Sequence, residues 1–117
     1  MKNLFITGGA LLLGAYSAGC VPKAALHTEV ESAAIRGAEE SGANEVPVAS
    51  LYLQYAKEEV EYATTMHANG DKEEAESMLL RAQADAELAV VLARQAAEKV
   101  DAEAAVERVR VLRSENK

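Results

Sequence analysis

The stretch NGDKEEAESMLLRAQADAELAVVLA, residues 69–93, decides how this chain folds. Gly70 suits the left-handed conformation that closes a helix, and Asp71 can cap the next helix with Glu74 at the capping-box position. After this turn, apolar residues recur every three or four positions, which is the spacing of one helix face. The pattern therefore predicts two helices joined by a tight turn that consists of Asn69, Gly70 and Asp71.

The helix after the turn is predicted to run from residue 71 to about 113, and one of its faces is almost entirely alanine. The residues of this face are separated alternately by four and three positions, as in the heptad of closely packed helices. We call them the alanine seam: Ala75, Leu79, Ala82, Ala86, Ala89, Ala93, Ala96 and Val100. Small seam residues let helices approach closely, but each methyl group removes little area from water, so modest tertiary stabilisation is predicted. After Val100 the apolar positions shift phase, to Ala102, Ala105, Val109 and Leu112.

Two further helices are predicted before the turn, over residues 23–41 and 47–69. Gly42 is expected to end the first helix, and Pro47 suits the first position of the second. The apolar face predicted for the first helix consists of Leu26, Val30, Ala33, Ala34, Gly37 and Ala38. The face predicted for the second consists of Tyr52, Ala56, Ala63 and Met66, flanked by Leu51, Tyr55 and Tyr62. The side chains that are expected mostly in solvent are Lys57, Glu58, Glu59 and Glu61.

These lengths predict an all-α fold, an antiparallel alanine-rich three-helix bundle with a long C-terminal helix. At 1.5 Å per residue, the last helix is about 65 Å long and each of the other two is about 30 Å. Short turns make neighbouring helices antiparallel. The helix of residues 47–69 should therefore lie back along residues 71–92, with the first helix beside the same stretch. The segment from about residue 94 to residue 117 is expected to project, or to pack against another copy.

The first twenty residues have the order of a secretory signal. A positive charge at Lys2 is followed by a short apolar stretch over residues 4–15, and small residues then precede Cys20. The stretch is shorter than the roughly 20 apolar residues that span a bilayer. The segment resembles the signal of bacterial lipoproteins, which implies lipidation of Cys20, the chain's only cysteine. The predicted organisation is a signal peptide at 1–19, a lipidated tether at 20–22 and a helical domain at 23–117.

Composition excludes several classes of function. Removal of residues 1–19 leaves 98 residues, and because Lys2 is lost the net charge changes from −7 to −8. A chain with this acidic net charge is not expected to bind nucleic acid, because that binding needs clustered Lys and Arg residues. Five aromatic residues leave little for a pocket that binds a small-molecule substrate. His27 and His67 have no cysteine or second histidine at ligand spacing, so we predict no metal site, no cofactor and no enzymatic activity.

The helical part of the chain resembles the small envelope lipoproteins grouped as domain of unknown function 4398. The residues that carry the resemblance are Leu51-Tyr52, Tyr55-Ala56-Lys57, Ala63, Asn69-Gly70-Asp71, Glu74-Ala75 and the run Arg81-Ala82-Gln83-Ala84-Asp85-Ala86-Glu87-Leu88-Ala89. It covers residues 25 to about 100. The family's usual Pro-Glu entry to the second helix is replaced here by Val46-Pro47-Val48. The resemblance implies an envelope location and a helical fold, and no established activity.

The leading hypothesis is a structural or interaction lipoprotein, anchored by lipid in the bacterial outer membrane and facing the periplasm. Val21 follows Cys20 in place of the aspartate that retains lipoproteins at the inner membrane, which by resemblance favours the outer membrane. The last helix would contact a protein partner or another copy. One alternative is a periplasmic adaptor for an envelope enzyme or transporter. Another is a peptidoglycan-associated spacer, whose wall contacts would come from Arg108, Arg110, Arg113 and Lys117.

Overall fold

The computed structural model describes residues 25–117, and all regular structure in this range is helical. The helices are α1 (Glu29–Glu40), α2 (Pro47–Asn69) and α3 (Lys72–Glu115), with a short 3₁₀ turn, η1 (Ala43–Glu45), between α1 and α2. The all-α fold with a long C-terminal helix is thus confirmed. The predicted signal peptide, Cys20 and the tether lie outside the described residues.

Helix α1 is shorter than predicted, because it begins at Glu29 and residues 25–28 are not helical. Thr28 occupies the N-cap position, and its carbonyl accepts a 2.9 Å hydrogen bond from the amide of Ser32. The side chain of Thr28 makes no capping hydrogen bond, whereas the acidic Glu29 and Glu31 in the first turn favour the positive end of the helix dipole. This charge preference favours a helix start at Glu29.

The turn between α2 and α3 is at Gly70, as predicted. Gly70 has φ +100°, and its amide donates to the carbonyl of His67 at 3.1 Å. The amide of Asp71 donates to the carbonyl of Met66 at 3.0 Å, so two carbonyls at the end of α2 are satisfied. The predicted capping box at Asp71 is wrong, because its side chain makes no capping hydrogen bond. With ψ of 69°, Asp71 lacks the extended backbone usual for an N-cap.

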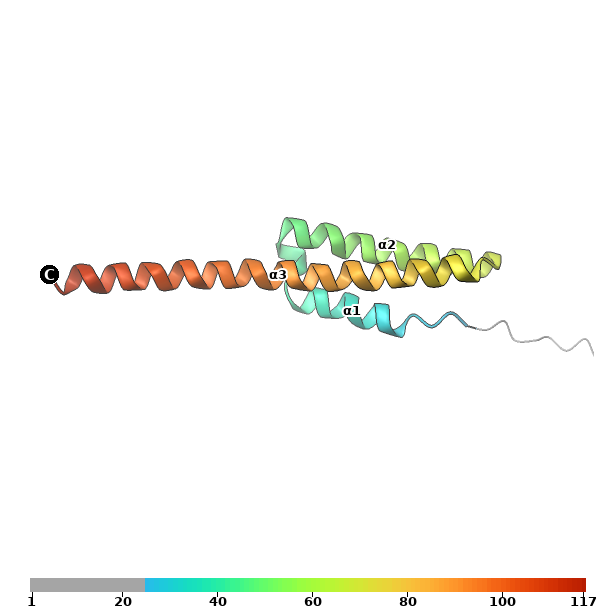
Figure 1. The fold of residues 1–117 in the computed structure, drawn as a ribbon, viewed down its shortest axis with the longest axis horizontal. Coiled ribbons are helices and arrows are strands. Elements are labelled where there is room, and N and C mark those ends of the chain that lie inside the picture. The colour runs from blue at the N-terminus through green and yellow to red at the C-terminus, as the bar shows by residue number, and fades with distance from the viewer. Residues whose placement is uncertain (1–24) are drawn as a thin grey trace, which may run out of the picture.

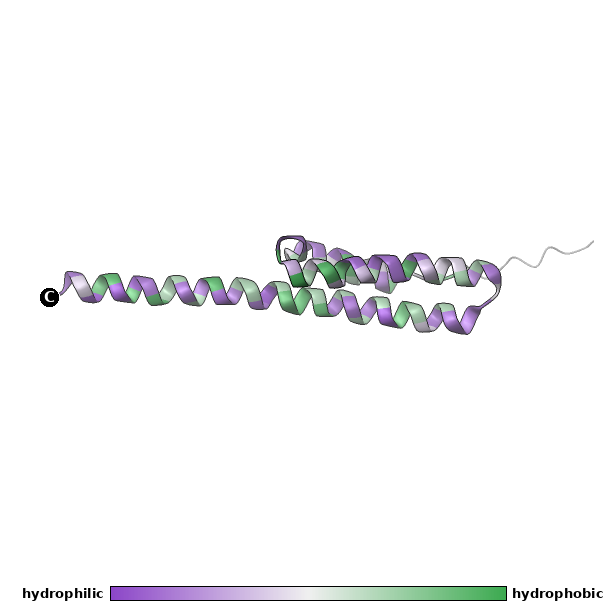
Figure 2. Ribbon diagram, turned by 90° about the horizontal axis from the view of Figure 1, so that it is seen from above, coloured by the Kyte–Doolittle hydropathy of each residue, from purple (hydrophilic) through white to green (hydrophobic). Residues whose placement is uncertain are grey.

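The three helices form an antiparallel bundle over the first half of α3 (Figure 1). In that view α2 and α1 lie on either side of α3. In Figure 2 both lie above α3, on the same side of it, so the opposite face of α3 is open. The core is almost entirely alanine, and Leu53 is its largest fully buried side chain. One cluster joins Ala38, Ala43, Ala49, Leu53, Ala89 and Ala93, and a second joins Ala63, Ala75 and Leu79.

The helix faces predicted for α1 and α2 are partly wrong. In α1, Val30 is 58% exposed and Ala33 is exposed, whereas Glu31 and Ala38 are buried. In α2 the buried face includes Leu53, which the sequence analysis left out, and Tyr52 is only half-buried. The apolar spacing predicts the helices, but the predicted faces are rotated by a fraction of a turn from the buried ones. The reason is that alanine occupies both buried and exposed positions, so the two faces differ little in hydrophobicity.

The alanine seam is buried from Ala75 to Ala93 and uncovered after that. Ala96 is half-buried and Val100 is 64% exposed, so the last two predicted seam residues do not pack in the core. The reason is length, because η1 and the first turn of α2 pack at the level of Ala89 and Ala93 and nothing reaches further. Residues 97–117, which we call the arm, are exposed throughout and project from the bundle (Figure 1).

Candidate interaction surface

The arm holds five of the eleven exposed valine and leucine side chains of the described residues. Its valines and leucine are between 44% and 64% exposed: Val100, Val106, Val109, Val111 and Leu112. They lie on a single helix that has no neighbour in the structure, in a protein whose core is made of alanine. Exposed apolar side chains of this kind make the arm the candidate interaction surface.

The apolar residues of the arm shift phase after Val100. Val100 and Ala102 are two residues apart, which is about 200° around an α-helix. Ala102, Ala105 and Val109 therefore lie on roughly the opposite side of α3 from the seam. The arm has two apolar faces, one that continues the seam and one that faces away from α1 and α2.

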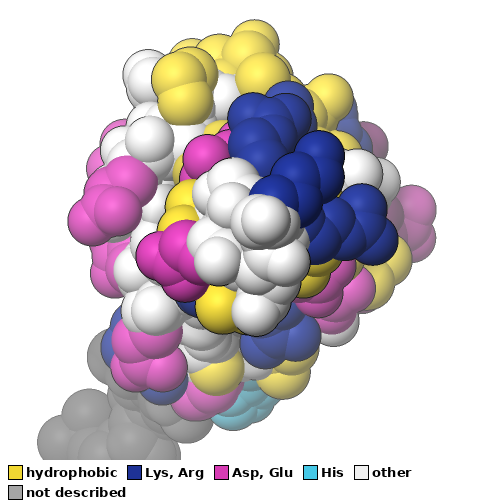
Figure 3. Space-filling model, turned by 90° about the vertical axis from the view of Figure 1, so that its left-hand side faces the viewer, with side chains coloured by type: hydrophobic (Ala, Val, Ile, Leu, Met, Phe, Trp, Pro, Cys, Tyr) yellow, Lys and Arg dark blue, Asp and Glu magenta, His cyan; other side chains and the backbone are white. Residues whose placement is uncertain are grey.

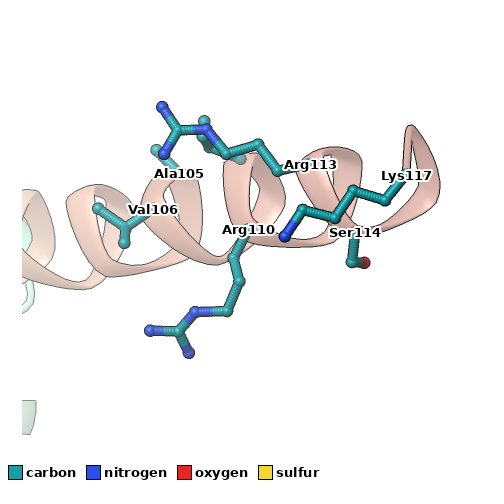
Figure 4. A pocket seen from close by; sticks show the side chains of 7 residues that line it. Ala105, Val106, Arg110, Arg113, Ser114 and Lys117 are labelled. Carbon is teal, nitrogen blue, oxygen red and sulfur yellow. The ribbon is translucent and has the colours of Figure 1, made fainter.

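The four basic residues proposed for wall contact lie in the last ten residues and are all exposed. Figure 3 looks onto this end, where Lys and Arg side chains gather on one side. Arg110 Nη1 pairs with Glu107 Oε2 at 3.1 Å on the same helix. In the close view of the shallow depression around Ala105 and Val106, the side chains of Arg110 and Arg113 extend from different sides of the helix (Figure 4). The basic residues form a charged helix end and not a closed anion pocket.

A buried carboxyl group at Glu59 is the main feature that the sequence analysis missed in the bundle. Glu59 was expected mostly in solvent, yet it is only 7% exposed. Its Oε1 forms a salt bridge with Arg81 Nη2 of α3 at 2.9 Å, while its Oε2 is buried without a hydrogen-bond partner. Burial, and then the negative charge of Asp85, raise the pKa of Glu59, and the charge of Arg81 opposes them. Glu59 thus makes a titratable contact between α2 and α3. Glu31 of α1 likewise has a buried, unpartnered Oε2.

The described residues contain no group of three or more His, Cys, Asp or Glu side chains that could hold a metal ion. His27 lies in the non-helical segment before α1, where its Nδ1 is 3.8 Å from Glu29 Oε1, and His67 lies in the last turn of α2. Asn69, Gly70 and Asp71 form the turn, and none of them lines the depression around Ala105 and Val106 or the one at Glu59. Glu59, Arg81 and Asp85 line a small depression with Tyr55 and Tyr62, in which nothing resembles a nucleophile activated by a base.

None of the helices in residues 25–117 is both long enough and apolar enough to cross a membrane. No family model, no curated protein and no solved structure matches this chain. The candidate site among the described residues is the exposed surface of the arm of α3.

Proposed function

We propose that this chain is a lipid-anchored structural or interaction protein of the bacterial outer membrane that faces the periplasm and uses α3 to bind a protein partner. The observation that carries the proposal is the arm. About 30 Å of helix exposes valine and leucine side chains, although the same chain fills its core with alanine. A helix that is not packed against anything gains no burial energy from such residues, so a partner is needed to cover them.

The sequence supports the proposed anchor. The apolar stretch before Cys20 and the lack of any other cysteine favour lipidation at that residue. Each buried CH₂ of an acyl chain contributes about 0.8 kcal/mol, and stable attachment needs more than one chain. The helical domain would then be held at its N-terminal end, with α3 free to contact other envelope components.

The anchor is tested by expressing the full chain in a Gram-negative host and following palmitate incorporation and membrane fractionation. Cys20→Ser should abolish labelling and release or trap the protein, whereas Ser114→Ala, at the far end of the chain, should behave as the native protein does. Labelling of the Cys20→Ser variant, or its continued recovery with the outer membrane, would refute the anchor.

The interaction surface is tested in cells with a photo-crosslinking amino acid at Val109 on the arm. Thr64, an exposed residue of α2, is the matched control position. Adducts that form from position 109 and not from position 64 support a partner on the arm. Equal adducts from both positions, or none from position 109, would contradict the proposal.

A second candidate function, a spacer associated with peptidoglycan, is favoured by the exposed basic end of α3. Arg108, Arg113 and Lys117 would attract wall carboxylates, and salt should weaken this attraction. The test is to boil cell walls in detergent and to probe for the protein before and after muramidase digestion. Recovery only after digestion, lost on deletion of Lys117, supports covalent attachment, whereas complete extraction by hot detergent eliminates it.

A further inference from the structure

A second heptad stripe runs along α3 on the face that α1 and α2 leave open. Its residues are separated alternately by four and three positions, and all of them are exposed. We call them the outer stripe: Ala84, Leu88, Val91, Gln95, Glu98, Ala102, Ala105, Val109 and Leu112. Leu88 is 37% exposed and Val91 is 59% exposed within the bundle, and Val109 is 47% exposed on the arm. The stripe continues without a change of phase from the bundle into the arm.

The outer stripe is apolar at both ends and polar in its middle. Ala84, Leu88 and Val91 form its first part, and Ala102 to Leu112 form its last part. Between them lie one amide, Gln95, and one carboxylate, Glu98. A partner that fits this face must therefore present apolar, polar and apolar segments in the same order, at the spacing of a helix.

Charged residues at every seventh position follow the edge of the outer stripe, and their signs alternate. They are Glu87, Arg94, Asp101, Arg108 and Glu115. Seven residues are nearly two full helical turns, so these side chains lie in one row. A row of alternating charge beside an apolar stripe selects a partner and fixes its register, as the flanking positions of coiled coils do.

We infer that the outer stripe binds the outer stripe of a second copy of this chain, in antiparallel orientation. In the register that matches both sequences, Leu88 faces Ala105 of the second copy and Val91 faces Ala102 of the second copy. Gln95 then lies opposite Glu98 of the second copy, where an amide can donate to a carboxylate. In each of these two apolar pairs a larger side chain, Leu88 or Val91, faces an alanine of the second copy. This alternation of large and small side chains allows the helices to pack closely.

The flanking charges agree with the same register. Arg94 lies beside Asp101 of the second copy, and Glu87 lies beside Arg108 of the second copy. Two-fold symmetry repeats each pair, because an isologous interface uses every contact twice. A shift by one heptad would instead place Arg94 beside Arg94 of the second copy or Asp101 beside Asp101 of the second copy. A shift by two heptads toward the C-terminus would place Glu98 against Val109 of the second copy.

Parallel pairing is disfavoured by the same residues. It would bring Glu98 against Glu98 of the second copy at the centre of the interface. It would also place Arg94 beside Lys99 of the second copy and Arg108 beside Arg113 of the second copy. Repulsion between these like charges disfavours parallel pairing. The antiparallel arrangement is the one in which neither the stripe nor its edge brings like charges together.

This inference deepens the proposed function, since it names the partner of α3. Each arm would lie on the open face of the other copy's bundle, over about 40 Å of helix. The two N-terminal ends would then lie at opposite ends of the paired rod. Two anchored chains would hold such a rod along the membrane surface.

The test measures the oligomeric state of the full chain, purified in a non-ionic detergent, by sedimentation equilibrium with the detergent density-matched. We expect a dimer whose dissociation constant rises roughly tenfold or more in Arg94→Glu and in Asp101→Arg, because each change turns two attractive contacts into repulsive ones. The double variant R94E/D101R should restore the native constant. Glu103→Arg, a charge reversal off the flanking row, is the control and should leave the constant unchanged.

A monomeric native chain, or a double variant that is no tighter than the single ones, would overturn the inference. Comparison of Val109→Asp with Val111→Asp shows which face of the arm forms the dimer contact. The two valines are similarly exposed, at 47% and 44%. Val109→Asp should abolish the dimer and Val111→Asp should not, and the reverse result would overturn the inference as well. Palmitate labelling of the same samples reports on the anchor independently, so failure of the dimer and failure of the proposed function are distinguishable.

Discussion

At the scale of single residues, Glu59 is unusual because its ionisable carboxyl group is buried. It is buried between α2 and α3, with one oxygen held by Arg81 and the other without a hydrogen-bond partner. Burial of a polar atom without a hydrogen bond is unfavourable, and a charge increases the cost. Protonation removes that charge, which is why the pKa of Glu59 is raised above its ordinary value.

Glu59→Gln should make folding less sensitive to pH. An acid whose pKa is raised in the folded state contributes stability that is present below its unfolded pKa of about 4.3 and is lost as pH rises through the folded value. The thermal midpoint of the native protein, measured by circular dichroism from pH 4 to pH 8, should therefore fall more steeply than that of Glu59→Gln. Glu58→Gln, an exposed neighbour, serves as the control. Parallel profiles for all three proteins would show that Glu59 is not the group responsible.

At the scale of elements, the alanine seam sets the distance between α3 and its neighbours. Ala82, Ala86 and Ala89 have no exposed surface, so a larger side chain at any of them has no room without movement of a helix. The same property explains why a core with so few large residues holds together, because closely approaching helices gain dispersion contacts along their whole length.

Ala89→Leu should destabilise the bundle by about 1–3 kcal/mol through overpacking. Ala97→Leu is the matched control, since Ala97 is exposed and leucine is nearly as good a helix former as alanine; it should change stability by less than about 0.5 kcal/mol. Urea denaturation followed by circular dichroism measures both. Equal midpoints for the two variants would mean that the seam does not pack as closely as the structure indicates.

At the scale of the whole molecule, the protein divides into a bundle that folds around its own core and an arm that adds nothing to that core. The arm is helical because it continues α3, so it needs no separate helix nucleation. Its contribution is therefore expected in assembly and not in the folding of the monomer.

A chain that stops after Ala96 should separate these two roles. In dilute solution its thermal midpoint should stay within about 3 °C of that of the monomeric native chain, because no buried contact is removed. At high concentration the native dimer should melt higher than the truncated chain, since association stabilises by mass action. Differential scanning calorimetry over a range of concentrations measures this. A large loss of midpoint in dilute solution would contradict the division.

Sequence alone determined the helices, because they depend on local signals. Gly70 and Pro47 have the backbone conformations that the turn and the helix start require, and the heptad of alanines marked the buried face of α3 from Ala75 to Ala93. The start of α1 was misplaced, since Leu26 has the apolar spacing of the helix, yet the helix begins only at Glu29, with the acidic Glu29 and Glu31 in its first turn.

Only the tertiary structure decided which faces are covered and where coverage ends. The heptad continues to Val100, but α1 and α2 are too short to reach it, and that limit is set by how three helices dock. Glu59 is buried for the same reason: its own helix would leave it in solvent, and α3 brings Arg81 against it. The outer stripe could be counted in the sequence, yet only the docked bundle showed that it is the face left open along the whole of α3. Periodicity is a property of one helix, whereas exposure depends on the neighbours that the folded chain provides.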